Sequence, residues 1–101
     1  MAKKRRIAPV HPGEHLREEL RERGISRNQL SRDIRIPLSR VSLIGSGKRG
    51  ISADTALRLA RYFGTSPQMW LNLQNRYDLD VANASAERIA REVIPAGQSA
   101  A

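Results

Sequence analysis

The stretch that decides the fold is RIPLSRVSLIGSGKRG, residues 35–50. Its apolar residues recur at helical spacing and Pro37 stands where a proline opens a helix, so we expect a short helix over residues 37–46. At about 100° per residue, such a helix turns one side to the core and the other outward. The inward side holds Pro37, Val41 and Ile44, and the outward side with its shoulders holds Leu38, Ser39, Arg40, Ser42, Leu43 and Ser46.

A second short helix is expected directly before this stretch. Ser26 is placed to cap it, and Leu30 and Ile34 face inward with the small Ser31 between them. Only residues 35–37 separate the two helices. Two short helices joined by so tight a turn have the helix-turn-helix geometry, in which the second helix enters the major groove of DNA. The small side chain of Ser31 fits this geometry, because the two helices cross closely.

The rest of the chain is also helical in pattern, since its large apolar residues recur at three- and four-residue spacings and its β-branched residues are scattered. We expect further helices over residues 12–23, 53–63 and 67–77, and a weaker one over residues 85–93. The prediction is an all-α fold, with five helices in a compact domain at residues 11–80. A basic flexible arm is expected at residues 1–10, a helical extension at 81–94 and a disordered tail at 95–101.

Charge is distributed unevenly along the 101 residues. Residues 1–50 hold 13 Lys and Arg against five Asp and Glu, whereas residues 51–101 hold five of each, so the net charge of +8 lies in the first half. Such a surface suits a polyanion, and a basic face that is simply solvated is the alternative. Because we find no cysteine, no secretory signal and no apolar stretch long enough to span a membrane, we expect a cytoplasmic protein.

The outward side of the helix at residues 37–46 is predicted to read base edges. Short hydroxyls let the backbone approach the bases, a leucine methyl meets a thymine methyl, and Arg40 reaches guanine or a phosphate. Lys48 and Arg49 are placed for the phosphate backbone, with Ser46 beside them. The alternative for Leu43 is packing against the next helix, or exposure as an apolar residue that contacts no partner. Because glycine costs about 1 kcal/mol inside a helix, an end of this helix at Gly45, with Ser46 in the loop, is the alternative to an end at residue 46.

Neither catalysis nor metal binding is expected. His11 and His15 have the spacing of a helical metal pair with Glu14 between them, but no third ligand is evident. We interpret both histidines as surface or capping residues, and the nearby carboxylates as partners of arginines on the same helix. GSGKRG, residues 45–50, lacks the strand and the spacing of a nucleotide-binding phosphate loop. The sequence therefore predicts no cofactor and no enzymatic activity.

Three stretches resemble a known family: HPGEHLREEL (residues 11–20), LSRDIRIPLSRVSLI (30–44) and GKRGISADTALRLARYFGTSPQMWLNLQNRYDL (47–79). Over about residues 10–80 the chain resembles the HigA-type antitoxins, a branch of the λ-repressor-like (XRE) helix-turn-helix family. The resemblance implies a λ-repressor-like fold and an antitoxin that neutralises a small RelE-like ribonuclease toxin, HigB. It also implies that the antitoxin represses the shared operon as a dimer bound to operator DNA.

Within this resemblance, the family's recognition helix corresponds to residues 37–44, its basic loop to Lys48 and Arg49, and the backbone-contacting start of the preceding helix to Arg27. Two positions depart from the family pattern. Arg35 stands where a glycine is common, so it must adopt a positive φ or shift the turn. Gly45 stands where the family keeps a larger residue, which bears on where the recognition helix ends.

A dimer is also predicted, because one helix reads few base pairs and two-fold pairing supplies a second half-site. The candidate interface comprises Met69, Trp70, Leu73 and Tyr77, with packing in the core as the alternative for Trp70. Two other functions stay open: a stand-alone DNA-binding regulator of the same fold, and a module that binds RNA or protein. An adjacent toxin-like gene would separate an antitoxin from the regulator, and the absence of any preference for duplex DNA would indicate the module.

Overall fold

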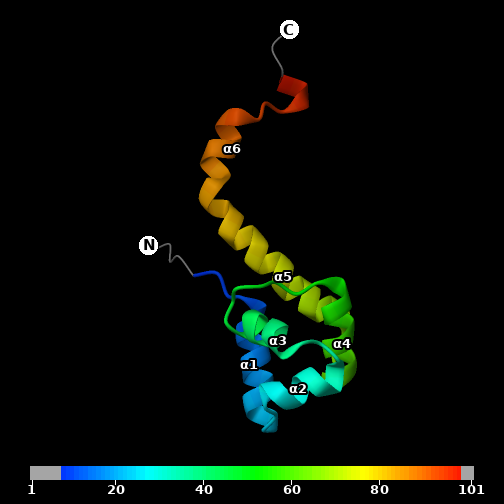
Figure 1. Cartoon of the computed structure of the whole chain (residues 1–101). Helices are drawn as coiled ribbons and strands as arrows, with labels where there is room; N and C mark the ends of the chain where they lie inside the picture. Colours follow the sequence, from blue (N-terminus) through cyan, green and yellow to red (C-terminus); the bar gives the residue numbers. More distant parts are fainter. Residues whose placement is uncertain (1–7, 99–101) are drawn as a thin grey trace.

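Helices make up nearly all of the part of the chain that the computed structural model describes, residues 8–98. The order is α1 (Pro12–Arg23), α2 (Arg27–Ile34), α3 (Leu38–Gly45), α4 (Ala53–Phe63), α5 (Pro67–Ala82) and α6 (Ala86–Glu92), with the 3₁₀ turns η1 (Asn83–Ser85) and η2 (Ala96–Gln98) (Figure 1). These residues include no strand, so the all-α prediction is confirmed for them. The KKRR of the predicted arm lies outside the described residues.

Serine caps fix where three of the helices begin. The hydroxyl oxygens of Ser26, Ser52 and Ser66 accept hydrogen bonds from backbone amides one turn on, at 3.0, 3.2 and 3.0 Å. Two glycines in the left-handed region, Gly24 (φ 66°) and Gly64 (φ 73°), follow α1 and α4. A glycine adopts this conformation without the steric cost that a side chain would incur. The predicted bounds of α1 and α4 are confirmed.

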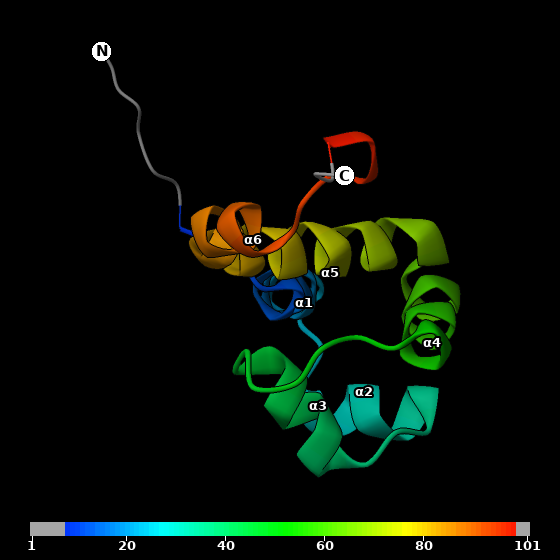
Figure 2. The same ribbon diagram turned by 90° about the horizontal axis from the view of Figure 1, so that it is seen from above.

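One hydrophobic core lies among α1 to α5. Trp70 is its largest member and has no exposed surface. Each fully buried large apolar side chain contributes about 1.5–3 kcal/mol to the stability of the fold. The other members of the core are Leu16, Leu20, Leu30, Ile34, Ile36, Val41, Ile44, Ile51, Ala56, Leu59, Ala60 and Phe63. Seen from above, α2 and α3 lie on one side of the molecule and α5 on the other, with α1 between them (Figure 2).

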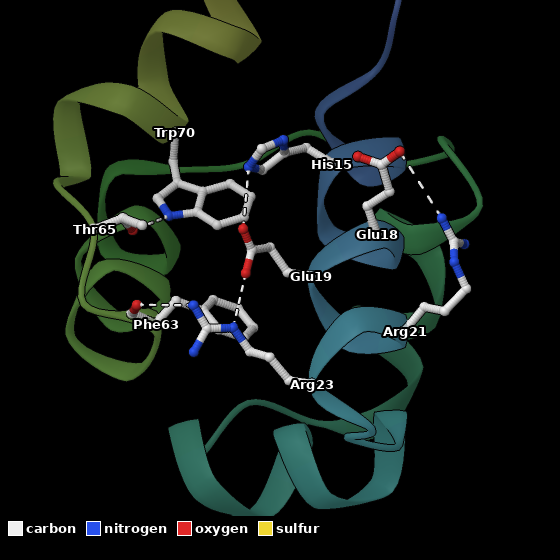
Figure 3. A network of polar contacts seen from close by, with 8 residues as sticks. All are labelled: His15, Glu18, Glu19, Arg21, Arg23, Phe63, Thr65 and Trp70. Atoms are coloured by element: carbon white, nitrogen blue, oxygen red, sulfur yellow. Dashed lines mark hydrogen bonds and ion pairs between the residues drawn. The ribbon is translucent and has the colours of Figure 1, made fainter.

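A polar network ties α1 to α4 and α5 on the side away from α3 (Figure 3). Glu19 lies 2.8 Å from Nε of Arg23 and 3.7 Å from Nε2 of His15. The guanidinium of Arg23 stacks 5.0 Å from the ring centre of Phe63, and the indole N–H of Trp70 donates to the Thr65 hydroxyl at 2.9 Å. This network and the core together join α1, α4 and α5, and α2 and α3 pack against α4 and α1.

The C-terminal part of the chain differs from its prediction. α5 continues to Ala82, whereas the sequence predicts an end near Tyr77. Two pairs one turn apart support the added length: Gln74 donates to Asp78 at 3.0 Å, and Arg76 donates to Asp80 at 3.0 Å. The predicted boundary between domain and extension therefore falls inside a continuous helix.

Beyond α5 the chain projects away from the helical core. α6 (Ala86–Glu92) is shorter than the predicted helix over residues 85–93, and none of its residues is buried. Figure 1 shows it leading away from the other helices, in a molecule with principal extents of 60 × 35 × 23 Å. The predicted disordered tail instead contains the turn η2 at Ala96–Gln98, without a buried residue, and residues 99–101 lie outside the described range.

Candidate nucleic-acid interface

The turn between α2 and α3 takes the form that the sequence predicts. Arg35 lies in the left-handed region at φ 60° and ψ 47°, so the first of the two expected outcomes for this residue is confirmed. The hydroxyl of Ser31 donates to the carbonyl of Ile36 at 2.6 Å. Ser31 therefore does more than leave room for the crossing of the two helices, because it also satisfies a backbone acceptor in the turn.

The prediction of the inner side of α3 is correct for two of its three residues. Val41 and Ile44 are each 2% exposed. Pro37, predicted to face the core with them, is exposed. The reason is that α3 begins at Leu38 and Pro37 is its N-cap, whose carbonyl accepts from the amides of Arg40 and Val41 at 3.0 and 3.1 Å. Its ring thus precedes the first helical turn.

The outer side of α3 is open. Leu38 and Leu43 are 42% and 40% exposed, Ser39 is exposed, and Arg40 and Ser42 are half-buried. The structure thus leaves accessible all five residues that the sequence assigns to base reading, and the exposure of Leu43 disagrees with its packing alternative. Their role in binding stays a prediction.

α3 ends at Gly45 and not at residue 46, so the alternative that rests on the cost of glycine in a helix is the correct one. Gly47, at φ 81°, reverses the backbone, and the amides of Gly47 and Lys48 donate to the carbonyls of Ile44 and Leu43 at 3.0 and 2.9 Å. This pair of bonds is the Schellman motif that closes many helices.

Ser46 lies in the loop after α3, and its hydroxyl donates to the carbonyl of Leu43 at 3.1 Å. A serine has a single hydroxyl proton, so in this rotamer it has none left for a phosphate. A phosphate contact by Ser46 therefore requires its hydroxyl to turn away from Leu43, and this role stays a prediction.

Four basic side chains gather at the C-terminal end of α3. Arg17 of α1 donates to the carbonyl of Gly45, and the guanidinium of Arg27 lies over the same glycine, where an added Cβ would sit 3.5 Å from it. Lys48 and Arg49 follow in the loop, and all four residues are exposed. Among the described residues no carboxylate forms an ion pair with any of the four, in contrast to Arg23, Arg58, Arg76 and Arg88.

The sequence did not point to Arg17 as part of this cluster. Its nearest carboxylate in the pattern, Glu14, predicts an ordinary surface pair, whereas its hydrogen-bond partner lies 28 residues further along the chain. Cations at a helix C-terminus stabilise the helix by about 0.3–1 kcal/mol, so Arg17 and Arg27 also support the position of α3.

The two histidines have structural roles on α1. Nδ1 of His11 accepts the amide of Gly13 at 2.9 Å, which makes His11 the N-cap that the sequence suggested, although it is buried and not on the surface. Burial lowers the pKa of His11 below its usual value. His15 packs edge-on against Trp70, with ring centres 5.2 Å apart. Across residues 8–98 no three His, Cys, Asp or Glu side chains gather as metal ligands would.

The predicted dimer patch is only partly available. Trp70 is fully buried by its own chain, which leaves no surface for a second subunit, so its packing alternative is the correct one. Met69, Leu73 and Tyr77 are half-buried.

Within the described part of the chain, no helix has the length and apolar character needed to cross a membrane.

Comparison with known proteins gives consistent results. The helix-turn-helix family model matches residues 16–70. Virulence-associated protein I of Dichelobacter nodosus is 46% identical over 89 residues, which cover 87% of this chain and 82% of that protein.

Two solved structures are similar over nearly their whole length. An addiction module antidote protein of the HigA family from Coxiella burnetii superposes with a TM-score of 0.83 at 50% identity, covering 88% of this chain and 99% of that one. The Pseudomonas aeruginosa antitoxin HigA, solved with the higBA promoter, gives a TM-score of 0.81 at 46% identity, covering 87% of this chain and 98% of that one.

Proposed function

This chain belongs to the helix-turn-helix family, and within it to the HigA-type antitoxins, and from that premise we propose that it represses transcription by binding operator DNA and neutralises a toxin protein. One observation of the structure carries the DNA-binding part. The outer side of α3 is open, and at its C-terminal end lie exposed arginines and a lysine that no described carboxylate neutralises. A short helix with an open outer side that carries hydroxyl groups, beside cations without a carboxylate partner, is the arrangement that major-groove readers use.

The two groups of residues have different tasks in this proposal. Leu38, Ser39, Arg40, Ser42 and Leu43 face the base edges, where hydroxyls, a guanidinium and methyl groups distinguish the base pairs. Lys48, Arg49 and Arg27 contact phosphates, which bind every sequence alike and release counterions.

A binding titration with single alanine variants tests this division. The probes are the duplex upstream of the gene for this chain and a scrambled duplex of the same composition. Ser39→Ala and Arg40→Ala should weaken binding to the matched duplex more than to the scrambled one. Lys48→Ala and Arg49→Ala should weaken both equally and lower the salt slope by about 1 each. Arg21→Ala, in α1, is the control and should change neither; equal losses on both duplexes for all four variants would contradict the division.

We further propose that two copies of the chain pair through the projecting C-terminal segment. This segment exposes apolar side chains that nothing in the described chain covers, namely Leu79, Val81, Ile89, Val93 and Ile94. A seven-residue helix such as α6 is marginal in water without a packing partner. A second copy would cover these side chains and would present a second α3 to the adjacent half-site.

The oligomeric state tests this pairing. Ultracentrifugation should show a dimer at tens of micromolar, and Leu79→Glu or Ile89→Glu should shift it to the monomer with loss of cooperative DNA binding. A monomeric wild-type protein would refute the pairing.

The toxin partner is proposed from the family, as a RelE-like ribonuclease encoded beside this chain. Co-expression with the neighbouring small reading frame, followed by affinity purification, should yield a stoichiometric complex and relieve the growth arrest caused by that frame alone. If no neighbouring product binds while the operator is still repressed, the chain is a stand-alone regulator instead.

A further inference from the structure

The loop that joins α3 to α4, residues 46–51, carries Lys48 and Arg49. We call it the basic loop. Its first half is held by α3 itself, through the Schellman bonds described above. Its second half has no such support from α3 or α4, because it precedes the cap of α4 at Ser52. Lys48 lies within these bonds, whereas Arg49 lies beyond them, so the position of Arg49 depends on the contact of its backbone with His11 and on what holds the far end of the loop.

A side chain of α5 holds that end. The amide of Ile51 donates to Oε1 of Gln74 at 2.7 Å, across 23 residues of chain. Gly50 lets the two approach, since a Cβ there would lie 3.0 Å from the Gln74 side chain. Nε2 of Gln74 donates to Asp78 at 3.0 Å, which orients the amide so that its oxygen points to the loop.

On its inner side the basic loop packs against residues of α1 and α5. A Cβ on Gly47 would lie 3.7 Å from the His11 ring, so the loop passes directly over this ring. The His11 ring packs edge-on against Tyr77 of α5, with centres 4.8 Å apart. Lys48 and Arg49 are exposed, whereas Ile51 at the end of the loop is buried.

We propose that Gln74, oriented by Asp78, is a positioning residue for DNA binding. It acts by holding the basic loop so that Lys48 and Arg49 contact the phosphate backbone of DNA at the same time. The inference rests on the proposed DNA-binding function and adds α5 to it. A loop that is released at one end must be ordered when DNA binds. That cost should weaken binding to every sequence by about 5- to 30-fold, as expected when one residue's backbone has to be fixed.

A double-mutant cycle tests the proposal. The probe is a random-sequence duplex, because phosphate contacts require no operator. Gln74→Met keeps the side-chain volume and removes the hydrogen bond; Asn75→Ala, exposed on the same helix, is the control. Gln74→Met should lose about 5- to 30-fold in affinity at unchanged salt concentration, while Asn75→Ala binds as the wild type does.

The coupling distinguishes positioning from general destabilisation. Replacing Lys48 and Arg49 together by alanine should cost the wild type several-fold more affinity than it costs the Gln74→Met protein, because the cations are already misplaced there. The same loss in both backgrounds would overturn the inference while leaving the proposed function intact. A wild-type protein that does not bind duplex DNA would overturn both.

Amide exchange on the wild-type protein gives a second test that needs no variant to fold. The Ile51 amide should exchange as slowly as the helical amides of α5, since its hydrogen bond to Gln74 is part-buried. Fast exchange at Ile51 would contradict the proposed anchoring.

Discussion

Replacing Arg35 by glycine should make the protein more stable, although it removes a charged side chain from a surface turn. Arg35 is the non-glycine residue of the described chain with a positive φ, and its φ of 60° and ψ of 47° lie at the centre of the left-handed region. For an L-residue this conformation costs about 1–2 kcal/mol, which glycine does not incur. The residue is exposed, so little packing is lost with its side chain.

The net gain follows from two opposing terms. Glycine relieves the strain in the folded state, but it also gives the unfolded chain more freedom, at a cost of about 0.4–1 kcal/mol. The difference is about 0.5–1 kcal/mol in favour of Arg35→Gly. In a chain of this size about 1 kcal/mol shifts the melting temperature by about 4–8 °C, so we expect a rise of about 2–8 °C.

Thermal unfolding followed by circular dichroism measures this shift. Arg35→Ala removes the same side chain but keeps the strain, so the difference between the glycine and alanine variants isolates the backbone. Gly64→Ala is the reverse change, at φ 73° with no atom within 4 Å of the added Cβ, and should lower the melting temperature. An Arg35→Gly protein that melts at or below the temperature of Arg35→Ala would refute the proposed backbone strain at this position.

Three further predictions concern the support of α3 and the projecting segment. Gly13→Ala places a Cβ against the carbonyl of Ile44, so α1 and α3 must separate; we expect a loss of about 1–3 kcal/mol in urea unfolding, against none for Gly97→Ala. Burial lowers the pKa of His11, so the unfolded chain binds more protons below pH 6.5 and stability should fall as the pH drops; His11→Asn keeps a capping oxygen and should show a weaker pH dependence. Proteolysis of the monomeric Leu79→Glu variant should cleave first within residues 83–98, and equal cleavage throughout would contradict the weak packing of that segment.

The helices could be predicted because their signals are local. Serine caps, terminal glycines and apolar spacing lie within a few residues of the structure that they determine, as Ser26 and Gly24 show. The exposure of Ser39 and Leu43 follows from the same periodicity, since Val41 and Ile44 fix the inner side of α3. The positive φ of Arg35 was one of two outcomes that the family resemblance implied, because a glycine is common at this position.

The contacts that link distant segments could not be predicted. Gln74 and Arg17 look like ordinary surface residues of their helices, yet their partners lie 23 and 28 residues away. Pro37 was misplaced because it is the N-cap of α3, with a non-helical ψ of 143°, so the 100° spacing of a helix does not place its ring. The length of α5 was missed because Asp78 and Asp80 resemble loop residues, although each accepts a hydrogen bond from the preceding turn.

The central claim is that the Ser39 side of α3 faces duplex DNA, and a single cysteine tests it directly. The chain has no cysteine, so Ser39→Cys introduces one unique thiol, and Asn75→Cys places the control thiol on α5. Alkylation of each variant is timed with and without a saturating operator duplex. The account predicts that DNA slows the alkylation of Ser39→Cys several-fold and leaves Asn75→Cys unchanged; equal rates at Ser39→Cys with and without bound DNA would contradict it.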